Sequence, residues 1–232
     1  MKKSNKTNVF QLFSRILPAF FLLTVFAASG WGQETIHYWS FNDGENSELD
    51  AGNNEPTTIP ADIGNGVINH GLSFSAFGGT TTNVEPGYAS GLAFCPAGSG
   101  NNGETFEIVV STEGFESIIF SFAAQRTTAG YDNNTIEVST DGGTTWGTVV
   151  DGLSLTSSFA LYTYDLTDID ENVNDNANVI IRVTLDINTA SGGGNNRYDN
   201  IKVTGDEILP ADQVATPAFD PNGGTFYEPV DI

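Results

Sequence analysis

The side chains that could perform chemistry in this chain are mainly carboxylates. The 232 residues include 29 Asp and Glu, but only two histidines, His37 and His70, and a single cysteine, Cys95. Two carboxylates flanking a scissile bond can hydrolyse a glycoside, although spacing in the sequence neither supports nor excludes such a pair. A zinc site built on cysteines or on several histidines is excluded, because each needs more of these residues.

The common catalytic motifs are absent from the sequence. It contains no Gly-x-Ser-x-Gly elbow, no phosphate-binding loop and no His-Glu-x-x-His helix. His37 lies in an alternating apolar and polar segment and His70 is beside a glycine, so both are interpreted as structural. Cys95 is interpreted as a small buried apolar residue. We therefore expect that the chain is not an enzyme.

The charge restricts the classes of partner. The chain has 8 Lys and Arg against 29 acids, a formal net charge of −21, and no basic cluster after residue 15. Nucleic-acid binding is excluded, because it depends on clustered cations that release counterions from phosphates. The same charge favours a soluble monomer and makes cations, calcium above all, the natural small partners.

Residues 1–32 have the character of a cleaved secretory signal peptide. Four basic residues and no acid lie in 1–15, and a mostly apolar run follows at 16–28. We expect cleavage just before Gln33, with a cut after Ser29 as the alternative. The other alternative, an uncleaved membrane anchor, is disfavoured because a bilayer span needs about 20 apolar residues. The mature chain is expected to be secreted, extracellular or at the cell surface, without membrane insertion.

From Thr35 onward, apolar and polar residues alternate with a period of two, and clusters of Gly, Asn, Asp, Ser and Thr interrupt the alternation. This pattern indicates an all-β chain of short antiparallel strands, each with one buried and one wet face. The expected fold is an antiparallel two-sheet β-sandwich of jelly-roll type over 33–205. The expected strands are 35–41, 71–77, 88–94, 104–110, 117–124, 134–139, 146–150, 159–166, 178–186 and 197–204.

The alternation also predicts which residues face the core. Ile118, Phe120 and Phe122 form one expected inward set, and 179, 181, 183 and 185 form another. Trp39 and Trp146 are also assigned to the core. Loops are expected at 44–65, 78–86 and 191–196, and loops at one end of a sandwich are a common place for binding.

Residues 139–146 read STDGGTTW and match the Asp-box pattern, Ser/Thr-x-Asp-x-Gly-x-Thr-Trp. Physically this predicts a hairpin turn, in which the Asp141 carboxylate accepts backbone N–H groups and the glycines adopt positive φ. Such boxes occur in sialidases and in many other secreted β proteins, as structural turns. A single copy does not indicate a sialidase.

The acidic segment 168–176 has oxygen-bearing side chains at alternate positions. Counted from Asp168, position six is Val173 where an EF-hand needs glycine, and position twelve is Val179 where a bidentate Glu is expected. The EF-hand interpretation fails. The segment is interpreted as an acidic connection between strands.

The opening residues 38–43 (YWSFND) and the closing residues 197–205 (RYDNIKVTG) flank this box. Together they resemble a domain common in secreted multidomain proteins of Bacteroidetes-type bacteria, which is similar to jelly-roll modules of carbohydrate-binding and adhesin proteins. The resemblance covers most of 36–205, and its motifs are short. It identifies a type of module better than it identifies a ligand.

The resemblance implies that the first and last strands lie side by side and that structural calcium binds where the opening loop meets the closing strand. Asn42, Asp43, Asp199 and Asn200 could supply hard oxygen ligands there. In the alternative, the opening residues cap a turn and Asp199 pairs with an arginine.

Carbohydrate binding would need exposed aromatic faces flanked by amides and carboxylates. Loop-proximal candidates are Tyr88, Tyr131 with Asp132, and Tyr198. In the alternative, each of these residues packs in the core or at its rim.

The C-terminal residues follow a different pattern. Residues 206–213 are polar and contain proline, which is typical of a linker. Residues 214–232 closely resemble the opening strand and turn of the chitobiase/β-hexosaminidase C-terminal domain, a small immunoglobulin-like accessory module. So short a piece cannot fold alone, so we expect a truncated domain of a longer protein; the alternative is a disordered tail.

These observations favour a secreted non-catalytic module for carbohydrate binding or surface adhesion, with a polysaccharide or cell-surface glycan as partner. One alternative is the N-terminal accessory part of an extracellular hydrolase whose catalytic domain lies outside this chain. The other is a structural spacer in a surface protein.

Overall fold

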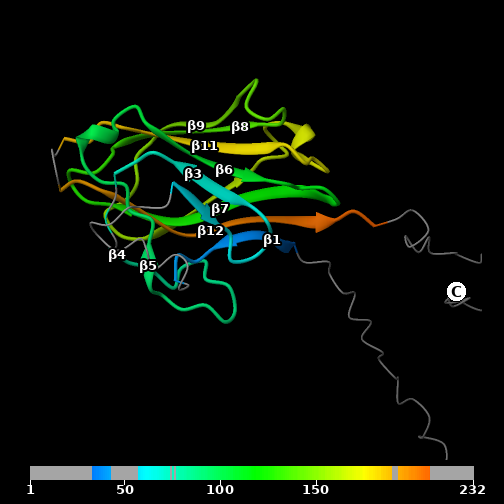
Figure 1. The fold of residues 1–232 in the computed structure, drawn as a ribbon, viewed down its shortest axis with the longest axis horizontal. Coiled ribbons are helices and arrows are strands. Elements are labelled where there is room, and N and C mark those ends of the chain that lie inside the picture. Colours follow the sequence, from blue (N-terminus) through cyan, green and yellow to red (C-terminus); the bar gives the residue numbers. More distant parts are fainter. Residues whose placement is uncertain (1–32, 43–56, 74, 76, 190–192, 210–232) are drawn as a thin grey trace, which may run out of the picture. The chain divides into compact units, whose positions relative to one another are not determined.

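The computed structural model describes residues 33–42, 57–73, 75, 77–189 and 193–209. They form an antiparallel two-sheet β-sandwich, as the alternation predicts. One sheet has four strands in the order β1-β12-β7-β10, and the other has six in the order β2-β3-β6-β11-β8-β9 (Figure 1). The four-stranded sheet comprises β1 (Glu34–Trp39), β7 (Phe115–Arg126), β10 (Ala160–Asp165) and β12 (Asn196–Glu207). The six-stranded sheet comprises β2 (Thr58–Pro60), β3 (Val67–His70), β6 (Thr105–Val110), β8 (Asn133–Ser139), β9 (Gly147–Leu153) and β11 (Val179–Asp186).

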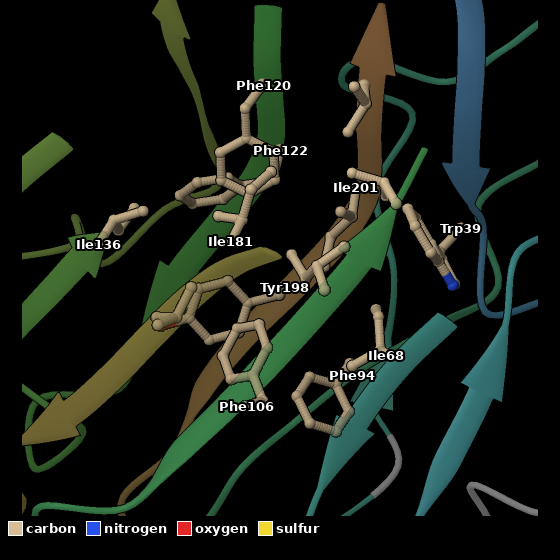
Figure 2. Packing of buried hydrophobic residues seen from close by; sticks show 14 of the residues in the cluster. Trp39, Ile68, Phe94, Phe106, Phe120, Phe122, Ile136, Ile181, Tyr198 and Ile201 are labelled. Atoms are coloured by element: carbon tan, nitrogen blue, oxygen red, sulfur yellow. The ribbon is translucent and has the colours of Figure 1, made fainter. Parts of the chain in front are cut away.

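The core lies between the two sheets and contains the residues that the alternation assigns to it. On β7, Ile118, Phe120 and Phe122 are at most 1% exposed, and the inward residues of β11 are equally buried. Figure 2 shows Phe120, Phe122 and Tyr198 from the four-stranded sheet packing with residues such as Ile181 of the other sheet. Burial of these apolar faces is the main stabilising contribution to the fold.

The first and last strands are neighbours, as the resemblance implies. β1 pairs with β12 from Glu34 opposite Gly205 to Trp39 opposite Ile201. The other end of β12 pairs with the end of β7, where Asn196 lies opposite Arg126. Both described termini of the sandwich therefore lie at the same end of β12.

The sequence prediction was wrong about several described residues between 57 and 94. β2 lies within the loop expected at 44–65, and β3 lies just before the strand expected at 71–77. Of that expected strand, the described residues retain Phe77, in β4 (Phe77–Gly78). The strand expected at 88–94 is reduced to β5 (Leu92–Ala93). β2 and β3 are too short to show a clear alternation. They pair with each other, and β3 joins them to the sheet by pairing with β6, which is distant in sequence.

The turn at 139–146 has the hydrogen bonds expected of its sequence. The Asp141 carboxylate accepts the backbone N–H groups of Thr145 (2.9 Å) and Thr144 (3.0 Å). Hydrogen bonds from the backbone and hydroxyl of Thr145, and from the Ser139 hydroxyl, are the main causes that lower its pKa to about 2. Gly142 and Gly143 have φ values of 70° and 92°, which residues other than glycine rarely adopt. The turn connects β8 to β9. The acidic segment 168–176 lies, as expected, in the connection from β10 to β11.

Cys95 is completely buried, and burial raises the pKa of its thiol to about 12. It is therefore protonated at neutral pH, in agreement with its interpretation as a small apolar residue. Among the residues that the structure describes, no helix has the length and apolar character needed to cross a membrane.

His37 is buried in its neutral form. Its Nδ1 accepts the backbone N–H of Gly66 (3.1 Å), so Nε2 carries the proton and donates to the carbonyl oxygen of Ser111 (2.8 Å). Burial lowers the pKa of His37 below 6.5. Below pH 6.5 the unfolded chain binds a proton at this position that the native protein does not bind, so stability should decrease as pH falls.

We expect the free energy of unfolding of the wild type to exceed that of His37→Gln by less at pH 5 than at pH 7. Thermal unfolding of both proteins across this range measures the difference, and the comparison cancels the contributions of the other titrating groups. An advantage that stays constant with pH would contradict the prediction.

Candidate functional site

Two of the predicted ligand-binding tyrosines are core residues. Tyr131 is 0% exposed, and its hydroxyl donates to the carbonyl oxygen of Gly98 (2.7 Å). Tyr198 is 2% exposed and packs against Phe106 and Phe122. Neither ring has a face that a sugar could contact, so the prediction of a binding role is wrong for both. The alternation could not separate a ring at the end of the core from a ring at the surface.

The other two predicted ligand residues are more exposed but are held in separate interactions. Tyr88 packs edge-on against Tyr38, with ring centroids 5.0 Å apart. The Asp132 carboxylate forms an ion pair with Arg126 (2.8 Å), beside β8. The four predicted residues therefore do not form one exposed surface.

A loop segment covers part of the outer face of the four-stranded sheet, over β7 and β12. This cover segment, residues 79–91, is held by polar contacts with β7 and β12. The Asn200 amide donates to the carbonyl oxygens of Thr80 (2.8 Å) and Thr82 (3.0 Å), and Lys202 forms an ion pair with Glu85. As a result, outward-facing residues such as Ala123 and Asp199 are completely buried.

Three of the four predicted calcium ligands lie around this cover segment. The backbone N–H of Gly79 donates to the carbonyl oxygen of Gly91 (2.6 Å). The Asp199 carboxylate lies against Gly79 and the Asn42 side chain against Gly91. Asp43, the fourth predicted ligand, lies outside the described residues.

The oxygens of these three side chains accept hydrogen bonds from the protein. Asp199 accepts the backbone N–H groups of Thr80 and Asn200, Asn42 accepts that of Leu92 (2.8 Å), and Asn200 accepts the Tyr38 hydroxyl. Burial raises the pKa of Asp199 to about 7. No group of three or more His, Cys, Asp or Glu suited to a metal is found in the described part of the chain. Structural calcium therefore stays a prediction.

The outer face of the six-stranded sheet, by contrast, is not covered by any segment that the structure describes. Its outward side chains are partly or fully exposed along β3, β6 and β11, while their neighbours in the alternation are buried. Strand register aligns one polar outward side chain from each strand into a row across the sheet. This polar row consists, from β2 to β9, of Thr58, Asn69, Glu107, Arg182, Glu137 and Thr148. With strands about 4.8 Å apart, it is on the order of 24 Å long.

Two charged residues at the centre of the polar row form an ion pair. Arg182 donates from both Nε (3.1 Å) and a terminal nitrogen (2.8 Å) to the same carboxylate oxygen of Glu137. Its guanidinium also lies over the Trp146 ring, 3.7 Å from the ring centroid. Trp146 is partly exposed on the outer face, so its assignment to the core was wrong. Trp39, assigned on the same grounds, is completely buried as expected.

A shallow depression of about 490 Å³ lies at the other end of the row. Its lining includes the row residues Thr58, Asn69 and Glu107, together with Glu104 and Thr105. Hydroxyl, amide and carboxylate groups thus line the depression, all of which exchange hydrogen bonds with hydroxylated ligands. A tryptophan beside the centre of the row and a polar depression at its β2–β3 end make this face the candidate binding site.

A second depression, of about 380 Å³, is lined by 126–128 and 155–157. Arg126 is the charged residue in its lining, but this side chain already binds the carbonyl oxygens of Leu155, Thr127 and Thr128 as well as Asp132. Its donors are therefore used to join the loops at this end of the sandwich. We regard this depression as structural.

The polar row could not be identified from the sequence. Each member is simply the polar residue between two apolar ones, such as Arg182 between Ile181 and Val183. Only the strand order and register place Asn69 two strands away from Arg182. The one available signal was the position of Trp146 at the end of its turn, beside the exposed face of a hairpin.

No protein-family model matches the chain, and no curated protein sequence is significantly similar to it. Solved structures with a similar course of the chain include the xylan-binding domain CBM22-1 of Paenibacillus barcinonensis Xyn10C. It is 9% identical with a TM-score of 0.44, over 76% of this chain and 97% of that one. TmCBM61, solved with β-1,4-galactotriose, is 11% identical with a TM-score of 0.39, over 61% of this chain and 88% of that one.

The K2 cleaved adhesin domain of Lys-gingipain is 9% identical with a TM-score of 0.37, over 60% of this chain and 88% of that one. The strand order and register of the chain itself define its fold as an antiparallel two-sheet β-sandwich, in which the described residues cover part of one outer face and leave the other open.

Proposed function

We propose that this chain is a secreted, non-catalytic carbohydrate-binding module, and that a polysaccharide or cell-surface glycan binds along the polar row. The observation that supports this proposal is the row itself, an uncovered line of polar side chains with a partly exposed tryptophan beside it. The secretion part of the proposal rests on residues 1–32, which lie outside the described residues. We further propose that the mature chain is monomeric.

The chemistry of the row suits a sugar chain. Sugar hydroxyls need polar partners in fixed positions, and the Asn69 amide and the carboxylates of Glu107 and Glu137 provide them. The C–H face of a sugar packs against an aromatic ring, which Trp146 provides. The length of the row allows several consecutive sugar units to be contacted at once.

The alternatives are an accessory part of an extracellular hydrolase and a structural spacer. Both would leave the polar row without a ligand of its own. The binding experiment below therefore distinguishes them from the proposed function. The proposed C-terminal domain at 214–232 lies outside the described residues and does not enter the experiment's interpretation.

The test is binding of the purified protein to soluble polysaccharides, measured by affinity electrophoresis and calorimetry. The panel contains xylan, cellulose oligosaccharides and β-1,4-galactan, the ligand classes named for structures of similar fold. We expect saturable binding to at least one polysaccharide. If no member binds, and a wider glycan array also fails, the carbohydrate-binding proposal is wrong and the spacer or hydrolase alternative gains support.

We also propose that calcium binds at the cover segment with Asp199 as a ligand. Adding 1 mM calcium should then raise the melting temperature of the wild type and have no effect on Asp199→Ala. A ligand that binds only the native state at 100 times its Kd adds about 2.7 kcal/mol of stability. Asp132→Ala serves as the matched control, because it removes one carboxylate that pairs with Arg126 rather than with the cover segment. An equal response of wild type and Asp199→Ala would exclude Asp199 as a ligand.

A further inference from the structure

Arg182 is the only lysine or arginine in the six strands of the open sheet. Building on the proposed function, we infer that the polar row selects an uncharged polysaccharide and rejects acidic ones, such as those containing uronic acid. We further infer that Glu137 and Glu107 determine this selectivity. An acidic polysaccharide would need a cation on the binding face, and Arg182 is the one candidate in these strands.

The charge of the Arg182 guanidinium is already balanced by a carboxylate of the protein. Its Nε and one terminal nitrogen donate to Glu137, and one of its faces lies against the Trp146 ring. Both members of the ion pair are about three-quarters buried, with side-chain exposures of 26% and 22%. A ligand carboxylate would have to displace Glu137 to pair with the Nε edge, and at any other edge it would bind next to the Glu137 charge. Arg182 therefore acts as a positioning residue for Trp146.

The surrounding charge also opposes an acidic ligand. Glu107 lies opposite Arg182 in register, on the other side from Glu137. Glu104 contributes a further carboxylate to the depression at the end of the row. Neighbouring strands are about 4.8 Å apart, which is less than the Debye length of about 8 Å in physiological salt. Salt therefore does not fully screen the repulsion between these carboxylates and a bound acid.

The same groups accept an uncharged ligand without this repulsion. Carboxylate oxygens accept hydrogen bonds from sugar hydroxyls, and the Asn69 amide and Thr148 hydroxyl can both donate and accept. Selectivity is thus built from the arrangement of charges within the row, rather than from the net charge of the chain alone.

The test uses two derivatives of a polysaccharide that the wild type binds. A carboxymethyl derivative adds negative charge, and a hydroxyethyl derivative of equal substitution adds similar bulk without charge. We expect the wild type to bind the carboxymethyl form at least tenfold more weakly than the hydroxyethyl form, with the gap narrowing as salt increases. Equal affinities at low salt would overturn the inference while leaving the proposed function intact. Binding of acidic polysaccharides alone would also overturn the inference, whereas failure to bind any polysaccharide, charged or uncharged, would refute the proposed function.

Variants separate the polar row from overall charge. The gap is the ratio of the dissociation constants for the carboxymethyl and hydroxyethyl forms. Glu137→Gln should reduce this ratio at least fivefold, because it releases Arg182 toward the ligand. Glu116→Gln on β7 is the matched control, since it removes the same charge from an exposed position in the other sheet. Equal narrowing in both variants would show that only net charge matters and would overturn the assignment.

Glu107→Gln is the second test variant, because it leaves the Arg182–Glu137 ion pair intact. It should lower the ratio of the two dissociation constants, carboxymethyl over hydroxyethyl, by about twofold to threefold, whatever its effect on the affinity for the hydroxyethyl form. If Glu137→Gln does not fold, Glu107→Gln provides the test. If the affinity ratio in Glu107→Gln is then as large as in Glu116→Gln, the polar row does not determine selectivity and the inference is overturned.

Discussion

Replacing Trp146 by alanine should weaken polysaccharide binding by about 30-fold or more. Removing an aromatic side chain at the centre of a binding surface commonly costs 2 kcal/mol or more, which corresponds to this change in Kd. Trp146 is the partly exposed tryptophan at the polar row, and the Arg182 guanidinium holds one face of its ring. Calorimetric titration of wild type and variant with the same polysaccharide measures the effect.

Two controls identify the origin of the loss. Trp146→Phe retains a smaller ring and should keep part of the affinity. Tyr88→Ala removes the ring of the cover segment, on the other sheet, and should bind as the wild type does. If Tyr88→Ala loses binding and Trp146→Ala retains it, the binding face is the covered sheet rather than the open one.

The fold should tolerate Trp146→Ala. The ring lies outside the buried hydrophobic cluster, and its contact with Arg182 is a cation–π interaction worth about 0.5–1 kcal/mol at an exposed site. Melting temperatures of the two proteins should therefore differ little. A large decrease in melting temperature would mean that the lost affinity reflects unfolding. The affinity of Trp146→Phe would then decide whether the ring binds the polysaccharide.

Phe122→Ala should destabilise the protein by about 3–5 kcal/mol, the usual range for deleting a buried aromatic ring. Phe122 is 1% exposed on the central strand β7, with the ring centroids of Phe120, Tyr162 and Tyr198 between 5.3 and 5.7 Å away. The cavity left behind would remove contacts to both neighbouring strands. For a domain of this size, we expect a melting temperature lower by about 10 °C or more.

Leu161→Ala is the matched control for this loss. Leu161 lies on β10, adjacent to β7, but its side chain is 50% exposed. Its truncation should change stability by no more than about 0.5 kcal/mol, as is usual at the surface. Chemical denaturation of the three proteins provides the comparison. Similar losses for both variants would contradict the placement of Phe122 at the centre of the core.

The two outer faces explain why different groups serve stability and binding. On the four-stranded sheet, residues such as Asp199 and Asn200 are used to attach the cover segment, and their polar atoms bind its backbone. On the six-stranded sheet, the corresponding outward side chains remain accessible. A glycan can form hydrogen bonds there without first displacing a part of the protein.

Much of the fold could be predicted from the sequence because its signals are local. Alternation in β7 and β11 depends only on the period of two that a strand imposes, and it correctly identified Phe120 and Ile181 as core residues. The turn at Asp141 could be predicted for the same reason, since its hydrogen bonds join residues at most four positions apart. β2 and β3 were missed because three or four residues carry too little pattern, and because β3 pairs with β6, which is distant in sequence.

The candidate site was decided by the tertiary structure. By itself the sequence determined the all-β class, the alternating faces and the acidic composition, because these follow from residue order and type. It did not determine that Tyr131 and Tyr198 lie inside or that Trp146 lies outside, since burial depends on what packs over a residue. The alignment of Asn69, Glu107, Arg182 and Glu137 likewise required strand register, which is fixed by pairing between strands in which partners such as Glu107 and Arg182 are 75 positions apart in the chain.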